Sequence, residues 1–282
     1  MRFWPYITAA ALLTGCDSNE APPTPKLAPA PIPTVRPEPP PTAKQAATFE
    51  STDGAVLAAD LYLAKPNAPA VVLLHRLHAQ REELSPLAER LASAPKRFTV
   101  LNLDLRDHGD SKAPKQAPRV AKKPAKDTSR FDADVTAAIA YLDRTTEHKM
   151  PRVILVGSSL GAVLAARAAK HDARVTALAL VSPGAAIDGL DVYQPYADVR
   201  ELPTFLAAAT DDNVSKAPFD SLSKMAKAGV TKQYPGPRHS AGHIAADHAE
   251  LWSDLVDWLV GQFDESPSPR SAPGAEKETA IR

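Results

Sequence analysis

This 282-residue sequence has almost no cysteine, no net charge and no apolar run long enough to cross a membrane. Its single cysteine, Cys16, excludes a disulfide bond within the chain. Lysine and arginine number 33 in total, as do aspartate and glutamate, so the formal net charge is zero. This balance gives no reason to expect nucleic acid or another strongly charged partner. The apolar run near the N-terminus, Ile7 to Leu13, is too short to span a bilayer as a helix.

Residues 1–16 have the pattern of a secretory signal. A short n-region with one positive charge, Arg2, precedes the apolar run, which closes on small residues. The ending Leu13-Thr14-Gly15-Cys16 resembles the bacterial lipobox, whose cysteine is acylated and becomes the first residue of the mature protein. This resemblance implies a lipoprotein of the bacterial cell envelope, anchored to a membrane through Cys16 and facing the periplasm or the cell surface. An ordinary signal peptide that happens to contain a cysteine is the alternative.

Proline is plentiful, and its uneven distribution divides the chain. The 28 prolines crowd into residues 21–43, 112–124 and 266–273, where we expect no regular structure. The remainder is long enough for one domain with a core of its own. We therefore predict a signal peptide at 1–15, a lipidated cysteine with a Pro-rich tether at 16–45, a folded domain at 46–265 with a basic flexible insertion at 112–130, and a disordered tail at 266–282.

Short apolar runs alternate with helical periodicity through the predicted domain. This alternation is typical of an α/β protein with a mostly parallel sheet covered on both faces. Strands are expected at 48–52, 55–63, 70–75, 98–103, 152–156, 175–181, 204–209 and 231–234, and helices at 82–94, 132–146, 162–169, 216–228 and 244–262.

A sharp turn with a central serine joins one of these strands to its helix. The strand Arg152 to Val156 is followed by Gly157-Ser158-Ser159-Leu160-Gly161 and then by an alanine-rich helix. Strand, tight turn and helix form the context that the G-x-S-x-G nucleophile elbow requires. Ser159, between the two glycines, is therefore the candidate nucleophile.

The order of these elements resembles the α/β-hydrolase fold over nearly all of residues 46–265. The strand ending in His75, the loop Arg106-Asp107-His108-Gly109-Asp110-Ser111, the elbow and a late histidine lie in that family's order. The resemblance implies a doubly wound sheet of about eight strands. Only about twenty residues separate Pro183 from Leu202, so no sizeable lid domain is expected.

In this family the acid and the histidine follow the serine. The run Asp211-Asp212-Asn213-Val214 offers two candidate acids. The family's spacing favours Asp211, and Asp212 is the alternative. We expect whichever aspartate is not the catalytic acid to cap the helix that follows. His239 fits the strand–glycine–histidine pattern, and His243 is its alternative.

By the same resemblance, two backbone N–H groups form the oxyanion hole, those of Leu160 and Leu77. The sequence departs from the family's His-Gly pattern at Arg76, because arginine does not freely adopt the positive φ that glycine can. Either the loop is built differently, or Arg76 overhangs the pocket and favours an anionic substrate.

The i, i+4 pair His239 and His243 raises the question of zinc. No glutamate follows the first histidine as in H-E-x-x-H, and Gly242 disfavours a helix there, so we predict no metal and no cofactor. The basic insertion is interpreted as a solvated loop, with contact to anionic lipid or substrate as the alternative.

The expected function is hydrolysis of a small-molecule carboxylic ester by a Ser-His-Asp triad through an acyl-enzyme. Peptidase and thioesterase activities use the same residues and stay open. A catalytically impaired lipoprotein that acts as a binding or scaffold module is the remaining alternative.

Overall fold

The computed structural model describes residues 42–94, 98–112, 129–147, 152–187 and 189–263, all of which belong to one unit, residues 39–282. The predicted signal peptide, Cys16, most of the Pro-rich tether, most of the basic insertion and the C-terminal tail lie outside these residues. Within them, no helix is long and apolar enough to cross a membrane.

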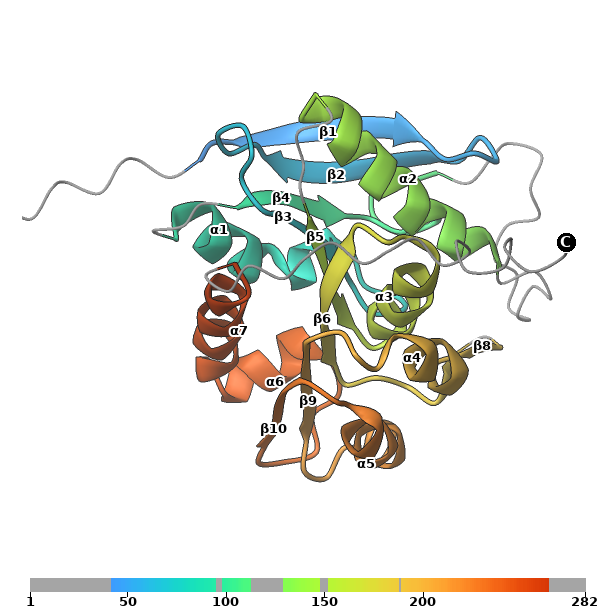
Figure 1. Ribbon diagram of the computed structural model, residues 1–282, viewed down its shortest axis with the longest axis vertical. Helices are drawn as coiled ribbons and strands as arrows, with labels where there is room; N and C mark the ends of the chain where they lie inside the picture. Colours follow the sequence, from blue (N-terminus) through green and yellow to red (C-terminus); the bar gives the residue numbers. More distant parts are fainter. Residues whose placement is uncertain (1–41, 95–97, 113–128, 148–151, 188, 264–282) are drawn as a thin grey trace, which may run out of the picture. The chain divides into compact units, whose positions relative to one another are not determined.

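Eight strands form one sheet in the order β1-β2-β4-β3-β5-β6-β9-β10 (Figure 1). The neighbours β1–β2 and β2–β4 are antiparallel, and every other neighbouring pair is parallel. The predicted mostly parallel α/β sheet is therefore confirmed. The strands are β1 (Lys44–Glu50), β2 (Val56–Tyr62), β3 (Ala70–Leu74), β4 (Thr99–Leu103), β5 (Val153–Ser158), β6 (Val175–Val181), β9 (Thr204–Ala209) and β10 (Gly229–Tyr234), and a separate short hairpin pairs β7 (Ala186–Ile187) with β8 (Leu190–Asp191).

Helices cover both faces of the sheet (Figure 1). One face carries α2 (Ser129–Thr145), α3 (Leu160–His171), α4 (Tyr193–Val199) and α5 (Lys216–Met225). The other face carries α1 (Ser85–Ser93), α6 (Ala241–Asp247) and α7 (Glu250–Gly261), and a 3₁₀ turn, η1 (Arg81–Glu83), precedes α1.

The central strands are buried on both sides, as their uninterrupted apolar sequences predict. All five residues of β3 are buried, with Val71 and Leu73 in one core and Val72 and Leu74 in the other. This alternation follows from the two-residue period of a strand. The sheet is thereby held rigidly between its two helical layers.

Several boundaries differ from those expected. β1 begins at Lys44, inside the predicted tether, because residues 44–47 pair with β2. The long C-terminal helix is instead two helices, α6 and α7, separated at His248, whose φ of −133° is not helical. Between β6 and β9 lie only the β7–β8 hairpin and the short helix α4, so the described residues there hold no large lid.

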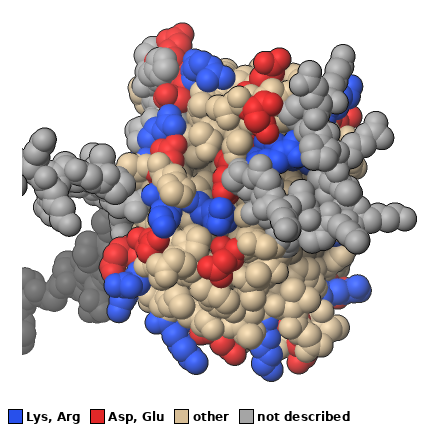
Figure 2. Space-filling view, turned by 90° about the vertical axis from the view of Figure 1, so that its right-hand side faces the viewer, with Lys and Arg blue, Asp and Glu red and all other residues tan. Residues whose placement is uncertain are grey.

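Charges of both signs are interspersed on the face of the domain that Figure 2 shows. Basic and acidic side chains lie next to one another there instead of forming a broad area of one sign. On this face, the distribution agrees with the balanced composition of the chain.

Candidate active site

The predicted site residues follow four parallel strands at the ends where those strands stop. Ser159 follows β5, Asp212 follows β9, His239 follows β10 and Leu77 follows β3. In a parallel sheet these carboxyl ends lie along one edge, where sites in open α/β sheets form. Residues far apart in the sequence are therefore brought to one place.

Ser159 occupies a strained position between β5 and α3. Its φ of 52° and ψ of −108° lie outside the regions that non-glycine residues prefer. Glycines make this turn possible, because a Cβ at Gly157 would lie 2.1 Å from the carbonyl oxygen of Gly161, and a Cβ at Gly161 would lie 2.0 Å from that of Leu74. The elbow is thus packed tightly against the end of β3.

Three side chains form a continuous hydrogen-bonded series. The Nε2 atom of His239 lies 2.7 Å from Ser159 Oγ, and its Nδ1 atom lies 2.9 Å from Asp212 Oδ2. An ionised carboxylate only accepts hydrogen bonds, so Nδ1 carries the ring proton and Nε2 is left to accept from the serine hydroxyl. This arrangement can withdraw a proton from Ser159 as its oxygen attacks a carbonyl carbon.

The structure corrects the choice of acid. Asp211, which the family spacing favoured, is exposed, and its Oδ2 accepts a hydrogen bond from Thr210 Oγ1 at 3.0 Å instead of contacting His239. Asp212, the alternative, is only 1% exposed and faces the histidine. The chain turns after β9, with the N–H of Asp212 donating to the carbonyl oxygen of Ala209 at 3.3 Å, and beyond this turn only Asp212 faces the histidine.

The N-cap of α5 is Ser215, so neither aspartate is the helix cap that we expected one of them to be, but two hydrogen bonds just before that helix end on Asp212. Its Oδ1 accepts hydrogen bonds from the backbone N–H groups of Val214 and Ser215 at 3.0 and 3.2 Å, just before α5. Burial raises the pKa of Asp212, but the hydrogen bonds from His239 and Ser215 outweigh that effect, so the net pKa is lowered. The carboxylate is therefore ionised at neutral pH, as the partner of an imidazole N–H should be.

Ser215 is a site residue that the sequence did not reveal. It is fully buried, and its Oγ lies 3.2 Å from Nδ1 of His239. The only feature of the sequence that could have indicated a role for Ser215 in the site was its place three residues after Asp212, at the start of a helix.

The alternative histidine does not meet the serine. His243 is exposed, and its Nδ1 lies 2.9 Å from the backbone carbonyl oxygen of His239. In the described part of the chain, no group of three or more His, Cys, Asp or Glu side chains could hold a metal ion.

The two N–H groups expected for the oxyanion hole belong to the start of α3 and to the loop after β3. Leu160 opens α3, where the first N–H groups of a helix have no intrahelical partner. Among the described residues, no protein acceptor bonds the N–H of Leu160 or of Leu77.

Arg76, which stands where the family's His-Gly pattern has glycine, does not strain the backbone of the loop after β3. The positive φ in this loop falls at His78, at 61°, and not at Arg76. The N–H of Arg76 donates to Glu83 Oε2 at 2.9 Å, and its Nη1 donates to the carbonyl oxygen of Leu77 at 3.2 Å. The loop therefore accommodates Arg76 without a positive φ at that position.

His75 supports the loops beneath the site. Its Nε2 accepts the N–H of Leu105 at 3.0 Å, and its Nδ1 donates to the carbonyl oxygen of Arg76 at 2.7 Å. Burial lowers the pKa of His75 to about 4, so the ring is neutral at physiological pH. His75 therefore has a structural role, linking the loop after β3 to the loop after β4.

Comparisons with known proteins agree with this architecture. An esterase from Pyrococcus furiosus is 17% identical, with a TM-score of 0.63 over 78% of this chain and 91% of that one. An esterase from a Rhodococcus species is 16% identical, with a TM-score of 0.58 over 76% of this chain and 98% of that one. A Butyrivibrio proteoclasticus protein solved with ferulic acid bound is 17% identical, with a TM-score of 0.57 over 76% and 100%.

At such identities these likenesses show the fold alone. A comparison with curated protein sequences gives no significant match. The sequence profile of the alpha/beta hydrolase family matches residues 71–279, which span the elbow, both aspartates and His239. The chain therefore belongs to the alpha/beta hydrolase family.

Proposed function

We propose that this protein is a serine hydrolase that cleaves carboxylic esters. The observation that carries the proposal is the series Ser159–His239–Asp212, with contacts of 2.7 and 2.9 Å. Such contacts are within the reach that a nucleophile and its general base require. The structural likeness to proteins described as esterases supports the substrate class.

The reaction follows from the site's geometry. Ser159 Oγ attacks the ester carbonyl carbon while His239 Nε2 takes its proton, and the N–H groups of Leu160 and Leu77 stabilise the oxyanion. His239 then protonates the departing alkoxide, which leaves an acyl group on Ser159. Water, deprotonated by His239, releases the acid, and Asp212 holds the imidazole in one tautomer throughout.

A fluorophosphonate probe tests the nucleophile. It should label the wild-type protein and fail to label Ser159→Ala, whereas Ser223→Ala should be labelled normally, because the Ser223 hydroxyl donates only within α5, to the carbonyl oxygen of Phe219. Absence of labelling in the wild type would leave the non-enzymatic binding module as the explanation. Rates on matched ester, thioester and amide substrates would separate esterase from thioesterase and peptidase activity.

We also propose that the domain is tethered to a membrane of the bacterial cell envelope through acylated Cys16. The support is the Leu13-Thr14-Gly15-Cys16 ending after a short apolar run, followed by a proline-rich segment. An anchored enzyme of this kind would act on esters at the periplasmic side or at the cell surface.

A further inference from the structure

A buried carboxylate lies behind the candidate active site, outside the Ser159–His239–Asp212 series. Glu83, at the end of the η1 turn, has a side chain that is only 7% exposed. Its Oε2 accepts the N–H of Arg76 at 2.9 Å, and its Oε1 accepts the Ser158 hydroxyl at 2.9 Å and the N–H of Gly242 at 3.3 Å. One carboxylate therefore takes donors from three separate segments.

Each of those segments carries a part of the proposed reaction. Arg76 precedes Leu77 in the loop after β3, and Ser158 precedes Ser159 in the elbow. Gly242 lies in the first turn of α6, the helix that follows His239. The oxyanion loop, the nucleophile and the base are thus joined through Glu83.

Ser158 extends this connection to a second backbone group. It is fully buried, and its Oγ accepts the N–H of Ala241 at 2.9 Å while donating to Glu83. Close packing adds to the hydrogen bonds, because a Cβ at Gly242 would lie 2.9 Å from Cγ of Glu83. Glycine at 242 therefore allows α6 to approach the carboxylate.

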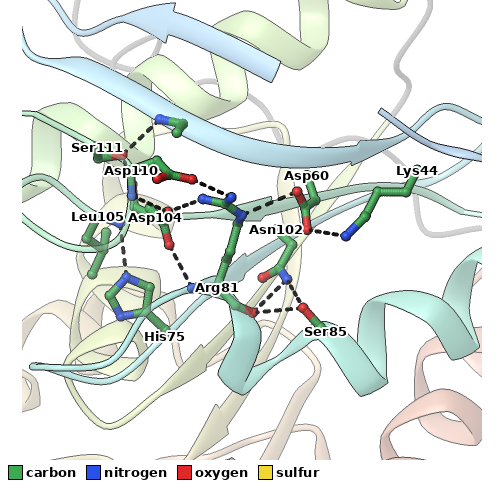
Figure 3. Close-up of polar contacts among 11 residues, drawn as sticks. Lys44, Asp60, His75, Arg81, Ser85, Asn102, Asp104, Leu105, Asp110 and Ser111 are labelled. Carbon is green, nitrogen blue, oxygen red and sulfur yellow. Dashed lines mark hydrogen bonds and ion pairs between the residues drawn. The ribbon is translucent and has the colours of Figure 1, made fainter. Parts of the chain in front are cut away.

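The turn that carries Glu83 is itself firmly anchored (Figure 3). The N–H of Arg81 donates to Oδ1 of the buried Asp104 at 2.7 Å, and Asn102 Nδ2 donates to the carbonyl oxygen of Arg81 at 2.8 Å. The Arg81 guanidinium also pairs with Asp104, with Asp60 at 3.3 Å and with Asp110 at 2.7 Å. Glu83 thus projects from a fixed point on the scaffold.

From these contacts we propose that Glu83 is a positioning residue, which holds the loop of Leu77, the elbow of Ser159 and the loop of His239 in register for ester hydrolysis. This inference rests on the proposed function. Side chains that are locked by such supporting hydrogen bonds keep reacting groups in productive geometry, and small displacements are costly to the rate.

Both carboxylate oxygens of Glu83 must accept hydrogen bonds, because donors face each of them. Ser158 accepts from Ala241, so its own proton points at Glu83. Two other partners are backbone N–H groups, and Nε of the Arg76 guanidinium lies 3.9 Å from Oε1, so every partner is a donor. Glutamine in this place would direct its NH₂ group at a donor, whichever way the amide is turned. Glu83→Gln therefore breaks at least one of the three connections with almost no change in volume.

The test compares E83Q with E82Q, since Glu82 lies on the same turn with its side chain exposed. With p-nitrophenyl butyrate as substrate, well below the melting temperature, we expect kcat of E83Q to fall about 10- to 100-fold, with KM within about threefold of wild type. Amide hydrogen exchange in E83Q should rise in residues 75–79, in residues 239–244 or in both, according to which oxygen of Glu83 the NH₂ group replaces. E82Q should match the wild type in both measurements.

A folded E83Q protein with unchanged kcat would overturn the proposal, and so would a lowered melting temperature with no change in kcat. Unchanged exchange in both segments would also refute it, because Glu83 would then hold neither of them. An inactive wild type whose E83Q variant nevertheless shows faster exchange in either segment would refute the proposed hydrolysis and support the positioning role of Glu83. The two failures are therefore distinguishable.

Discussion

Replacing Asp212 by asparagine should reverse the hydrogen bond on which His239 depends. The side-chain oxygen of the new residue must stay at the position of Oδ1, where Val214 and Ser215 donate at 3.0 and 3.2 Å. Turning the amide would set its NH₂ against both donors, at a cost of about 1–3 kcal/mol for each unsatisfied group. The NH₂ therefore replaces Oδ2, 2.9 Å from Nδ1 of the histidine.

An NH₂ group in that place donates to Nδ1 and moves the ring proton to Nε2. The histidine can then no longer accept the proton of Ser159, whose Oγ lies 2.7 Å from Nε2. A triad held in the wrong tautomer loses about 10³- to 10⁴-fold in kcat, which corresponds to about 4–5.5 kcal/mol of barrier. The overall shape of the side chain is unchanged, so KM should move little.

The assay is the initial rate of p-nitrophenyl butyrate hydrolysis, with folding checked by thermal melting. Asp211→Asn is the matched control, because that exposed carboxylate contacts only the Thr210 hydroxyl among the described side chains. His243→Ala is a second control, since its exposed ring contacts a backbone oxygen. Both should keep kcat within about threefold. Loss of activity in Asp211→Asn with activity kept in Asp212→Asn would refute the reasoning.

Two further predictions concern stability and anchoring. His75 stays neutral down to a pKa of about 4, whereas the unfolded chain takes up this proton near 6.5. The contribution of His75 to stability is therefore full above pH 6.5 and falls by about 3 kcal/mol as the pH drops to 4. Urea unfolding at successive pH values should show a steeper loss of stability in the wild type than in His75→Gln; equal slopes would contradict the assignment. A Cys16→Ser protein expressed in bacteria should move from the membrane fraction to the soluble fraction, and its retention at the membrane would contradict acylation.

Local patterns in the sequence predicted most of the fold. Apolar runs such as residues 70–74 pack on both faces of the sheet because a strand alternates its side chains with a period of two. The helix boundaries were less well predicted, since the end of α6 depends on how His248 packs: its Nε2 lies 2.8 Å from the carbonyl oxygen of Pro235, and its ring lies beside Tyr234. That contact joins residues that no local pattern connects.

The sequence by itself determined that Ser159 lies at a strained turn between a strand and a helix, because the turn and its two glycines are contiguous in the chain. Only the tertiary structure decided between Asp211 and Asp212. The turn after β9 leaves Asp211 exposed and Asp212 buried against His239, and spacing in the sequence does not encode that difference. Glu83 was likewise invisible in the sequence, since it contacts Ser158 and Gly242 across 75 and 159 residues. Such contacts exist only once the sheet has brought its strand ends to one edge.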